Sequence, residues 1–140
     1  MIPIYAAVPI AGVTTFLIGA VWYSPALFGD AAIALRPAVP AGTVTPSVPL
    51  IMGFEFLRCL ILSTAFAAAL WRLGITDLQS ALLVAVVVWG GFQVFPMIGS
   101  ILHEGYPARL FAIHMGDALV KALAICVALT LLSASLVAGE

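Results

Sequence analysis

Four long apolar stretches fill most of the 140-residue chain, and no other feature of the sequence restricts the fold as strongly. Hydrophobic residues make up 64% of the chain and charged residues only 8%, whereas a soluble domain carries about 25% charged residues. So few charges cannot cover a surface that faces water. Because a helix needs about 20 apolar residues to cross a bilayer, the sequence predicts an integral membrane protein.

The predicted fold class is all-α: an integral membrane four-helix bundle of up-down topology with a long first loop. The predicted spans are 2–23, 48–73, 77–102 and 107–137, in a single transmembrane domain, residues 1–140. Ser47 is placed to cap the second span, and Gly74 to end it. Thr76 and Gln79 have capping-box spacing at the start of the third span. The short link between these two spans predicts an antiparallel hairpin.

The N-terminus, the first loop and the third span each carry a further local signal. The N-terminal stretch lacks a positively charged region, so we expect a retained first span rather than a signal peptide. Prolines between positions 37 and 46 predict an irregular first loop, with a short interfacial helix at Ala31–Leu35. Pro96 in the third span removes a helical hydrogen bond and frees the carbonyl of Phe92.

Ionisable side chains interrupt two of the spans: Glu55 and Arg58 in the second, Asp117 and Lys121 in the fourth. A charge near the bilayer centre costs about 2.5–3.5 kcal/mol on insertion scales, so the four groups are expected to pair. In an up-down bundle the second and fourth spans are parallel, and Arg58 and Asp117 each lie about ten residues from the same face. We therefore predict an Arg58–Asp117 pair between the helices, which Glu55 and Lys121 extend.

Gln93 and His114 reach a similar depth when residues are counted along their spans. They are expected to satisfy the remaining polar groups. The predicted polar layer in the membrane is Glu55, Arg58, Gln93, His114, Asp117 and Lys121. This layer either locks the helices in register or forms a functional site, such as a proton relay or a small-solute pathway.

A second group of candidate residues lies on one side of the membrane, where the first span ends and the third span leads into the fourth. This shared-face motif is Trp22, Tyr23, Ser24, Pro25, His103, Glu104 and Arg109. Trp22 and Tyr23 are well placed as interfacial anchors. His103, Glu104 and Arg109 are acid/base groups near the polar layer, so the alternative is a vestibule over a polar cavity.

Small residues recur every four positions on the first and fourth spans, a pattern that lets membrane helices approach closely. The two stripes are Ala7, Ala11, Thr15 and Gly19 on the first span, and Ala118, Ala122, Cys126, Thr130 and Ala134 on the fourth. We expect helix–helix contacts along both stripes, either within the bundle or between protomers.

The sequence gives little sign of a metal, a cofactor or a nucleic-acid partner. The net charge of −1 provides no basic field for nucleic acid. Cys59 and Cys126 have no metal-binding spacing and are expected to pack as thiols. We predict no catalytic residue, no metal and no cofactor. The expected partners are the lipid bilayer and either further copies of the chain or a larger membrane complex.

Residues 19–29, GAVWYSPALFG, resemble the signature of a bacterial family of small four-helix membrane proteins of unknown function. The W-Y-S-P-x-x-F-G core carries the resemblance, and the chain length and the Glu104-Gly105-Tyr106-Pro107 link also fit. The chain departs from the family after Gly29, where Asp30-Ala31-Ala32 replaces a basic, tryptophan-containing continuation. The resemblance implies a fold and a bacterial cytoplasmic membrane location, but no activity.

Three functions fit these observations. The first is a non-enzymatic membrane protein, either a self-associating bundle or an accessory subunit of a membrane complex, with a charge-paired polar layer. The second is a small-solute or proton-coupled transporter that uses this layer. The third is a membrane enzyme acting on a lipid or quinone at the face that carries residues 103–109. Short loops and the lack of a catalytic motif favour the first.

Overall fold

The computed structural model describes residues 2–38 and 42–138, and this part of the chain is helical without any strand. Its elements are α1 (Ile2–Ala6), α2 (Val8–Trp22), α3 (Gly29–Ala34), α4 (Val48–Leu73), α5 (Leu78–Val88), the π-helix η1 (Trp89–Val94), α6 (Phe95–Glu104) and α7 (Ala108–Ala138). Within the described ranges, four helical segments are long and apolar enough to cross a membrane: Ile4–Trp22, Val48–Leu73, Leu78–Glu104 and Ala108–Ser135. The all-α class and the helical bundle are therefore confirmed.

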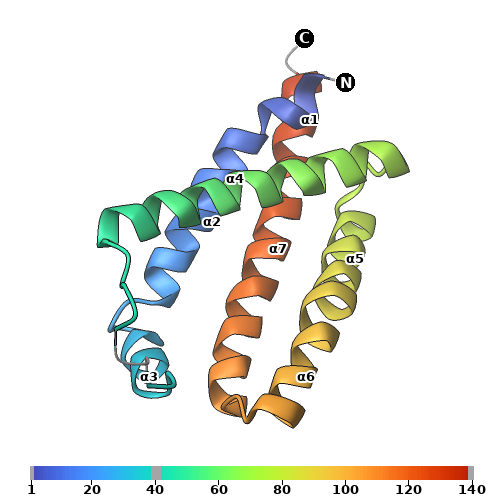
Figure 1. The fold of residues 1–140 in the computed structure, drawn as a ribbon. Coiled ribbons are helices and arrows are strands. Elements are labelled where there is room, and N and C mark those ends of the chain that lie inside the picture. The colour runs from blue at the N-terminus through green and yellow to red at the C-terminus, as the bar shows by residue number, and fades with distance from the viewer. Residues whose placement is uncertain (1, 39–41, 139–140) are drawn as a thin grey trace.

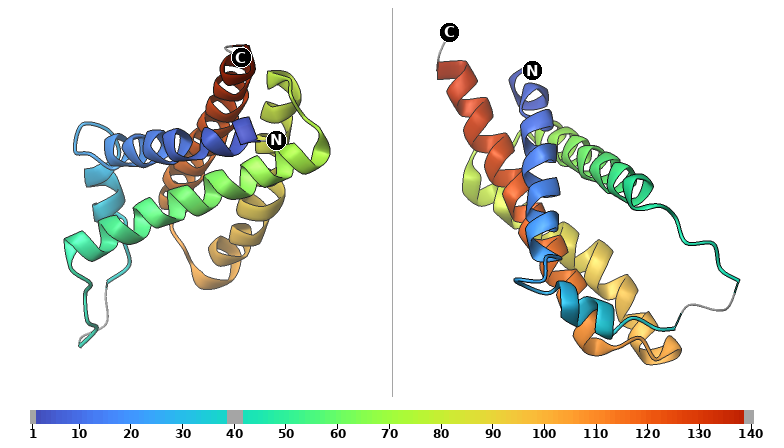
Figure 2. Two further views of the ribbon diagram at one scale, coloured as in Figure 1. Left: turned by 90° about the horizontal axis from the view of Figure 1, so that it is seen from above. Right: turned by 90° about the vertical axis from the view of Figure 1, so that its left-hand side faces the viewer.

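Helix α7 lies at the centre of the bundle (Figure 1). Helix α2 packs along α7, α5 packs along it from another side, and α1 contacts its C-terminal part. Helix α4 runs obliquely across α2 and α7, as Figure 2 shows from above, and it packs mainly on α2. Helices α4 and α5 diverge from the short turn between them, so the predicted antiparallel hairpin is wrong.

Local residue chemistry sets the ends of α4 and α5. Ser47 precedes α4, but its side chain forms no capping hydrogen bond. Gly74 follows the last residue of α4 with φ of 67°, a left-handed conformation that suits glycine. Helix α5 is capped by Asp77 and not by Thr76, because the Asp77 carboxylate accepts a hydrogen bond of 2.8 Å from the Ser80 backbone N–H.

The third apolar segment is not a uniform α-helix. Helix α5 widens into η1, and the α-helical form resumes in α6, which has Pro96 in its first turn. Proline lacks an N–H and its ring crowds the carbonyl four residues earlier, so a wider turn just before it relieves the clash. The π-helix lies against α7, where its Gln93 lines a small cavity together with Asp117.

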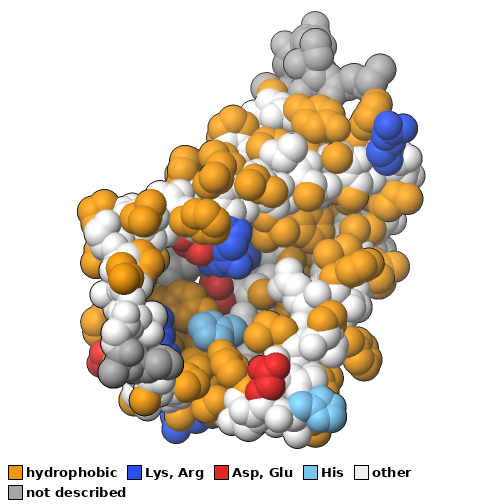
Figure 3. Space-filling model, in the orientation of Figure 1, with side chains coloured by type: hydrophobic (Ala, Val, Ile, Leu, Met, Phe, Trp, Pro, Cys, Tyr) orange, Lys and Arg blue, Asp and Glu red, His pale blue; other side chains and the backbone are white. Residues whose placement is uncertain are grey.

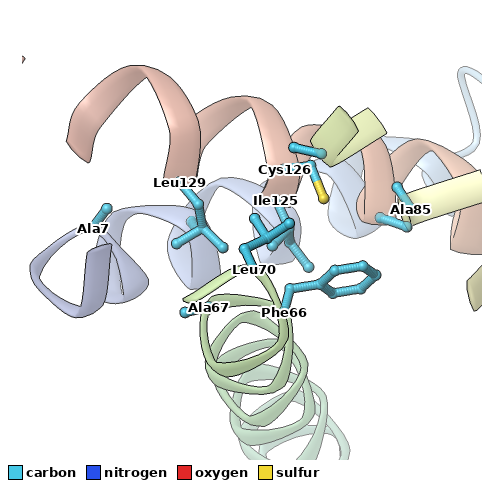
Figure 4. Close-up of a cluster of buried hydrophobic side chains, with 11 residues drawn as sticks. Ala7, Phe66, Ala67, Leu70, Ala85, Ile125, Cys126 and Leu129 are labelled. Carbon is cyan, nitrogen blue, oxygen red and sulfur yellow. The ribbon is translucent and has the colours of Figure 1, made fainter. Parts of the chain in front are cut away.

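An apolar core joins α2, α4, α5 and α7 (Figure 4). Phe66 and Leu70 of α4 meet Ile125 and Leu129 of α7 in this core, and all four side chains are buried. Alanines at the start of α2 and in α5 complete it, and their small size lets these helices approach α7 closely. The core fixes the half of the bundle that lies away from Glu55, Arg58 and Asp117.

The two small-residue stripes pack mostly inside the bundle. Every member of the first stripe is buried. In the second stripe, Ala122, Cys126 and Thr130 are buried, Ala118 is half-buried and Ala134 is exposed. The stripes therefore serve helix contacts within one chain over most of their length.

Candidate functional site

Lys121 of α7 lies between two carboxylates in the interior of the bundle. Its Nζ donates hydrogen bonds of 2.9 Å to Asp117 Oδ2 and 3.0 Å to Glu55 Oε1. Asp117 is one turn earlier on α7 and Glu55 is on α4, so the lysine links two helices. The Lys121 side chain is only 3% exposed, and this double pairing offsets the cost of burying its charge.

Arg58 pairs within α4 and not with Asp117. Its Nε and Nη2 donate to the two carboxylate oxygens of Glu55 at 2.9 and 2.6 Å, a bidentate arrangement. The predicted Arg58–Asp117 pair is therefore wrong, and the Glu55–Lys121 pair is the one that crosses between the helices. The prediction assumed equal depth along parallel helices, but α4 crosses α7 obliquely and meets it over a short stretch only. We call Glu55, Arg58, Asp117 and Lys121 the ion cluster.

The ion cluster borders an open cleft of about 480 Å³ between α2, α4 and the first part of α7. The cleft is lined by Tyr23, Arg36, Glu55, Arg58 and His114, which are polar, and by Phe16, Gly19, Ala20, Ile51 and Met52. Figure 3 shows a hollow on this face with acidic, basic and histidine side chains inside and hydrophobic side chains around it. Ligand pockets measure about 300–1,000 Å³, so the cleft is large enough for a small organic solute.

His114 binds Tyr23 rather than the ion cluster. Tyr23 Oη and His114 Nδ1 share a hydrogen bond of 2.6 Å, which joins the end of α2 to α7. His114 was predicted to satisfy the remaining polar groups of the layer, but its hydrogen bond goes to Tyr23. Since both residues also line the cleft, they present a phenol and an imidazole to its contents.

A second, much smaller cavity of about 30 Å³ lies between α4, η1 and α7. Gln93, Arg58, Asp117 and Lys121 are the polar residues that line it. Asp117 Oδ1 is buried, and no described group forms a hydrogen bond with it. The ion cluster therefore faces two spaces, the cleft and this small cavity.

Residues 22–29 fold into a tight turn after α2. Trp22 Nε1 donates a hydrogen bond of 3.1 Å to the carbonyl of Ile113 on α7, and its ring packs on Phe28. The Ser24 carbonyl accepts a hydrogen bond of 3.0 Å from the N–H of Gly29. A Cβ on Gly29 would collide with the backbone of the turn. The W-Y-S-P-x-x-F-G pattern therefore describes a packed turn that fastens α2 to α7.

The other shared-face residues do not reach the cleft. His103, Glu104 and Arg109 are exposed where α6 ends and α7 begins, and they are not among the residues that line the cleft. Pro25 is exposed in the turn after α2. The cleft instead takes its additional cation from Arg36, just after α3. Sequence reasoning missed Arg36 because no spacing connects this loop residue to the charged spans.

The site offers carboxylates, cations, a phenol and an imidazole around the cleft. Among residues 2–38 and 42–138, no group of three or more His, Cys, Asp or Glu side chains is arranged to hold a metal ion. Cys59 and Cys126 are free, buried thiols.

Four long apolar helices, with the buried Lys121–Asp117 pair between them, place this protein in the class of integral membrane helical bundles. A family model described as "Protein of unknown function (DUF1761)" matches residues 6–130. The chain therefore belongs to this family, and the predicted membership of a family of unknown function is confirmed over most of its length. Neither a curated protein nor a solved structure matches the chain.

Proposed function

We propose that this protein is a carrier that binds a small acidic solute in the cleft and moves it across the membrane. One observation carries the proposal: a buried lysine bridges two carboxylates beside an open cleft between apolar helices. Ionisable groups are rare within membrane spans, and those that occur there mark solute or ion pathways. The polar lining of the cleft supplies the contacts that orient a solute.

The charges around the cleft favour a solute with an acidic group. Arg36 and Arg58 carry two positive charges in the lining, against one negative charge on Glu55, which leaves one positive charge in excess. Behind them the charges of Lys121 and Asp117 cancel. The Arg58 side chain is 58% exposed, and Arg36 is exposed as well. Both guanidinium groups are thus accessible to a carboxylate, which an arginine can bind through two parallel hydrogen bonds.

The carrier proposal includes a setting for the protein. We place it in the bacterial cytoplasmic membrane as one domain whose four spans alternate in direction. Large hydrophobic side chains are exposed around the bundle and support contact with lipid tails or with helices of another chain. Because four spans seldom enclose a complete pathway, we propose a homo-oligomer or a larger membrane complex.

Uptake into proteoliposomes tests the carrier proposal, with short monocarboxylates and dicarboxylates as probes. Wild-type protein should take up at least one probe, and Arg58→Gln should lower its uptake about tenfold, the loss expected for one charge-assisted hydrogen bond. Arg72→Gln is the matched control, because it removes a cation from the same helix where Arg72 stacks on Trp71, away from the cleft. Lack of uptake of every probe by folded wild-type protein, or equal losses in both variants, would overturn the proposal.

The second candidate is a non-enzymatic structural role, as a self-associating bundle or an accessory subunit. Glu55 pairs with Arg58 and Lys121, Lys121 also pairs with Asp117, and the four residues carry no net formal charge, which favours this role. Glu55→Gln separates the two candidates. A carrier should fold normally with this change and lose uptake, whereas a structural lock should lose its helical assembly in mild detergent. A strictly monomeric wild-type particle without a co-purifying partner counts against the structural role.

A further inference from the structure

Asp117 has one carboxylate oxygen that no group in the described part of the chain satisfies. Its Oδ2 accepts a hydrogen bond from Lys121, but its Oδ1 is buried and has no hydrogen-bond partner. The Asp117 side chain is only 5% exposed, so bulk water does not surround it. Buried polar atoms are nearly always hydrogen-bonded, and a carboxylate oxygen is a strong acceptor, so a donor is expected beside it.

The small cavity beside Asp117 has the size and the lining to hold such a donor. Its volume of about 30 Å³ is room for a single water molecule. Gln93, Arg58 and Lys121 line it together with Asp117 and offer both donors and acceptors. A buried water typically makes about three hydrogen bonds, and this lining can provide them.

An irregular turn brings Gln93 to this cavity. Gln93 belongs to the π-helix η1, and Trp89 at the start of η1 donates a hydrogen bond of 2.8 Å to the carbonyl of Met115. This bond holds η1 against α7 within one turn of Asp117. Single π-turns are rare and occur frequently at functional sites. The π-helix η1 and the unsatisfied Oδ1 of Asp117 on α7 therefore lie at the same cavity.

We propose that this cavity is a proton-binding site in which one water molecule, held by Gln93, passes a proton to Asp117. The proton arrives as a hydronium ion, an O–H bond forms on Oδ1, and a neutral water molecule remains, so atoms and charge balance. The protonated Asp117 loses its negative charge, and Lys121 keeps Glu55 as its charged partner. The site differs from that of the proposed solute, because Gln93 and Asp117 line the small cavity and do not line the cleft.

Titratable groups surround Asp117 from three helices. They are Glu55, Arg58 and Cys59 on α4, His114 and Lys121 on α7, and Tyr23 at the end of α2. Glu55 is the other carboxyl group at this point, because both carboxylates accept a hydrogen bond from Lys121. Glu55 is therefore the group from which Asp117 must be distinguished.

Infrared difference spectroscopy of the full chain in nanodiscs tests the proposal, with acid titration and no solute. Wild-type protein should develop the C=O stretching band of a buried protonated carboxylic acid, and Asp117→Asn should lose this band. Glu104→Gln is the matched control, because it removes an exposed carboxyl group at the end of α6 and should keep the band. A band that persists in Asp117→Asn, or that Glu55→Gln abolishes instead, overturns the proposal.

Gln93→Leu is a second variant, which tests the proposal even if Asp117→Asn does not fold. It retains every charge and replaces the amide that lines the cavity with an apolar side chain. Its carboxylic acid band should shift in frequency relative to wild type, because the water that contacts Asp117 is lost. Identical spectra for Gln93→Leu and wild type would overturn the proposal. Solute uptake is measured separately, so failure of the proton site and failure of the carrier proposal are distinguishable.

Discussion

A Cβ atom on Gly19 of α2 would lie 2.6 Å from Nζ of Lys121 on α7. Real Cβ atoms do not approach a neighbour so closely, so the lack of a side chain at this position lets Lys121 lie against the backbone of α2. From there the lysine reaches Glu55 on α4. One glycine thus makes the meeting of three helices at the ion cluster possible.

Gly19→Ala should destabilise the protein, because Lys121 must move away from Asp117 or Glu55 to make room. Overpacking of a close-packed site costs about 1–3 kcal/mol. Thermal unfolding in detergent, followed by circular dichroism, measures the change. Gly53→Ala on α4 is the matched control, since its Cβ would meet nothing within 4 Å, and it should be neutral or slightly stabilising. Equal stability of Gly19→Ala and wild type would show that Lys121 does not need this space.

Lys121→Met should be the most damaging single change in the ion cluster, because it leaves the buried Asp117 carboxylate without a cation. Removal of one partner from a buried ion pair costs about 3–5 kcal/mol. Addition of Asp117→Asn to this variant should recover part of the loss, since the uncompensated charge is removed. Unfolding of the wild type, the single variant and the double variant in the same detergent measures both steps. A double variant no more stable than the single one would contradict this explanation.

Tryptophans from two elements fasten α7 through neighbouring carbonyls: Trp22 binds Ile113 and Trp89 binds Met115. Trp22→Phe retains an aromatic ring but removes the N–H donor, so it should lower the free energy of unfolding by about 1 kcal/mol or more. Trp71→Phe is the control, because Trp71 is 38% exposed and forms no such bond to α7. Unfolding midpoints of the variants test this. If Trp71→Phe lowers the free energy of unfolding as much as Trp22→Phe does, the hydrogen bond from Trp22 to α7 does not stabilise the fold specifically.

Signals from neighbouring residues predicted the bounds of the helices better than they predicted the contacts between helices. The apolar stretch 48–73 and the position of Gly74 predict the observed bounds of α4, since helix length and a left-handed glycine depend on neighbouring residues only. The small-residue stripe likewise pointed to Gly19 as a contact position. The pairing of Arg58 could not be predicted, because it depends on how obliquely α4 crosses α7. No spacing along either helix encodes that crossing.

The lining of the cleft and of the small cavity could not be predicted from the sequence pattern either. Arg36 reaches the cleft from an irregular loop, whose path is not set by any helical period. Gln93 was placed by counting along a regular helix, but η1 widens the backbone there and changes the direction of the side chains. Pro96 was the available signal, since a proline inside an apolar segment indicates a local irregularity.

Asp77→Ala should cost more stability at neutral pH than in acid. Asp77 precedes the apolar segment Leu78–Glu104, and the hydrogen bond from the Ser80 backbone N–H holds the pKa of its carboxyl below the usual value. A carboxyl group with a lowered pKa in the folded state stabilises fully above its unfolded-state pKa of about 3.9. That stabilisation is lost as the pH falls through the lower, folded-state pKa.

The difference in unfolding midpoint between wild type and Asp77→Ala should therefore be constant from neutral pH to about pH 5 and decrease below about pH 4. Thermal unfolding in one detergent across this range measures it. Asp77→Asn is the control, because asparagine caps a helix as well as aspartate does but does not titrate. The difference in unfolding midpoint between Asp77→Asn and Asp77→Ala should stay constant as the pH falls. If the difference in unfolding midpoint between wild type and Asp77→Ala also stays constant, the hydrogen bond to Ser80 does not depend on the charge of the carboxylate.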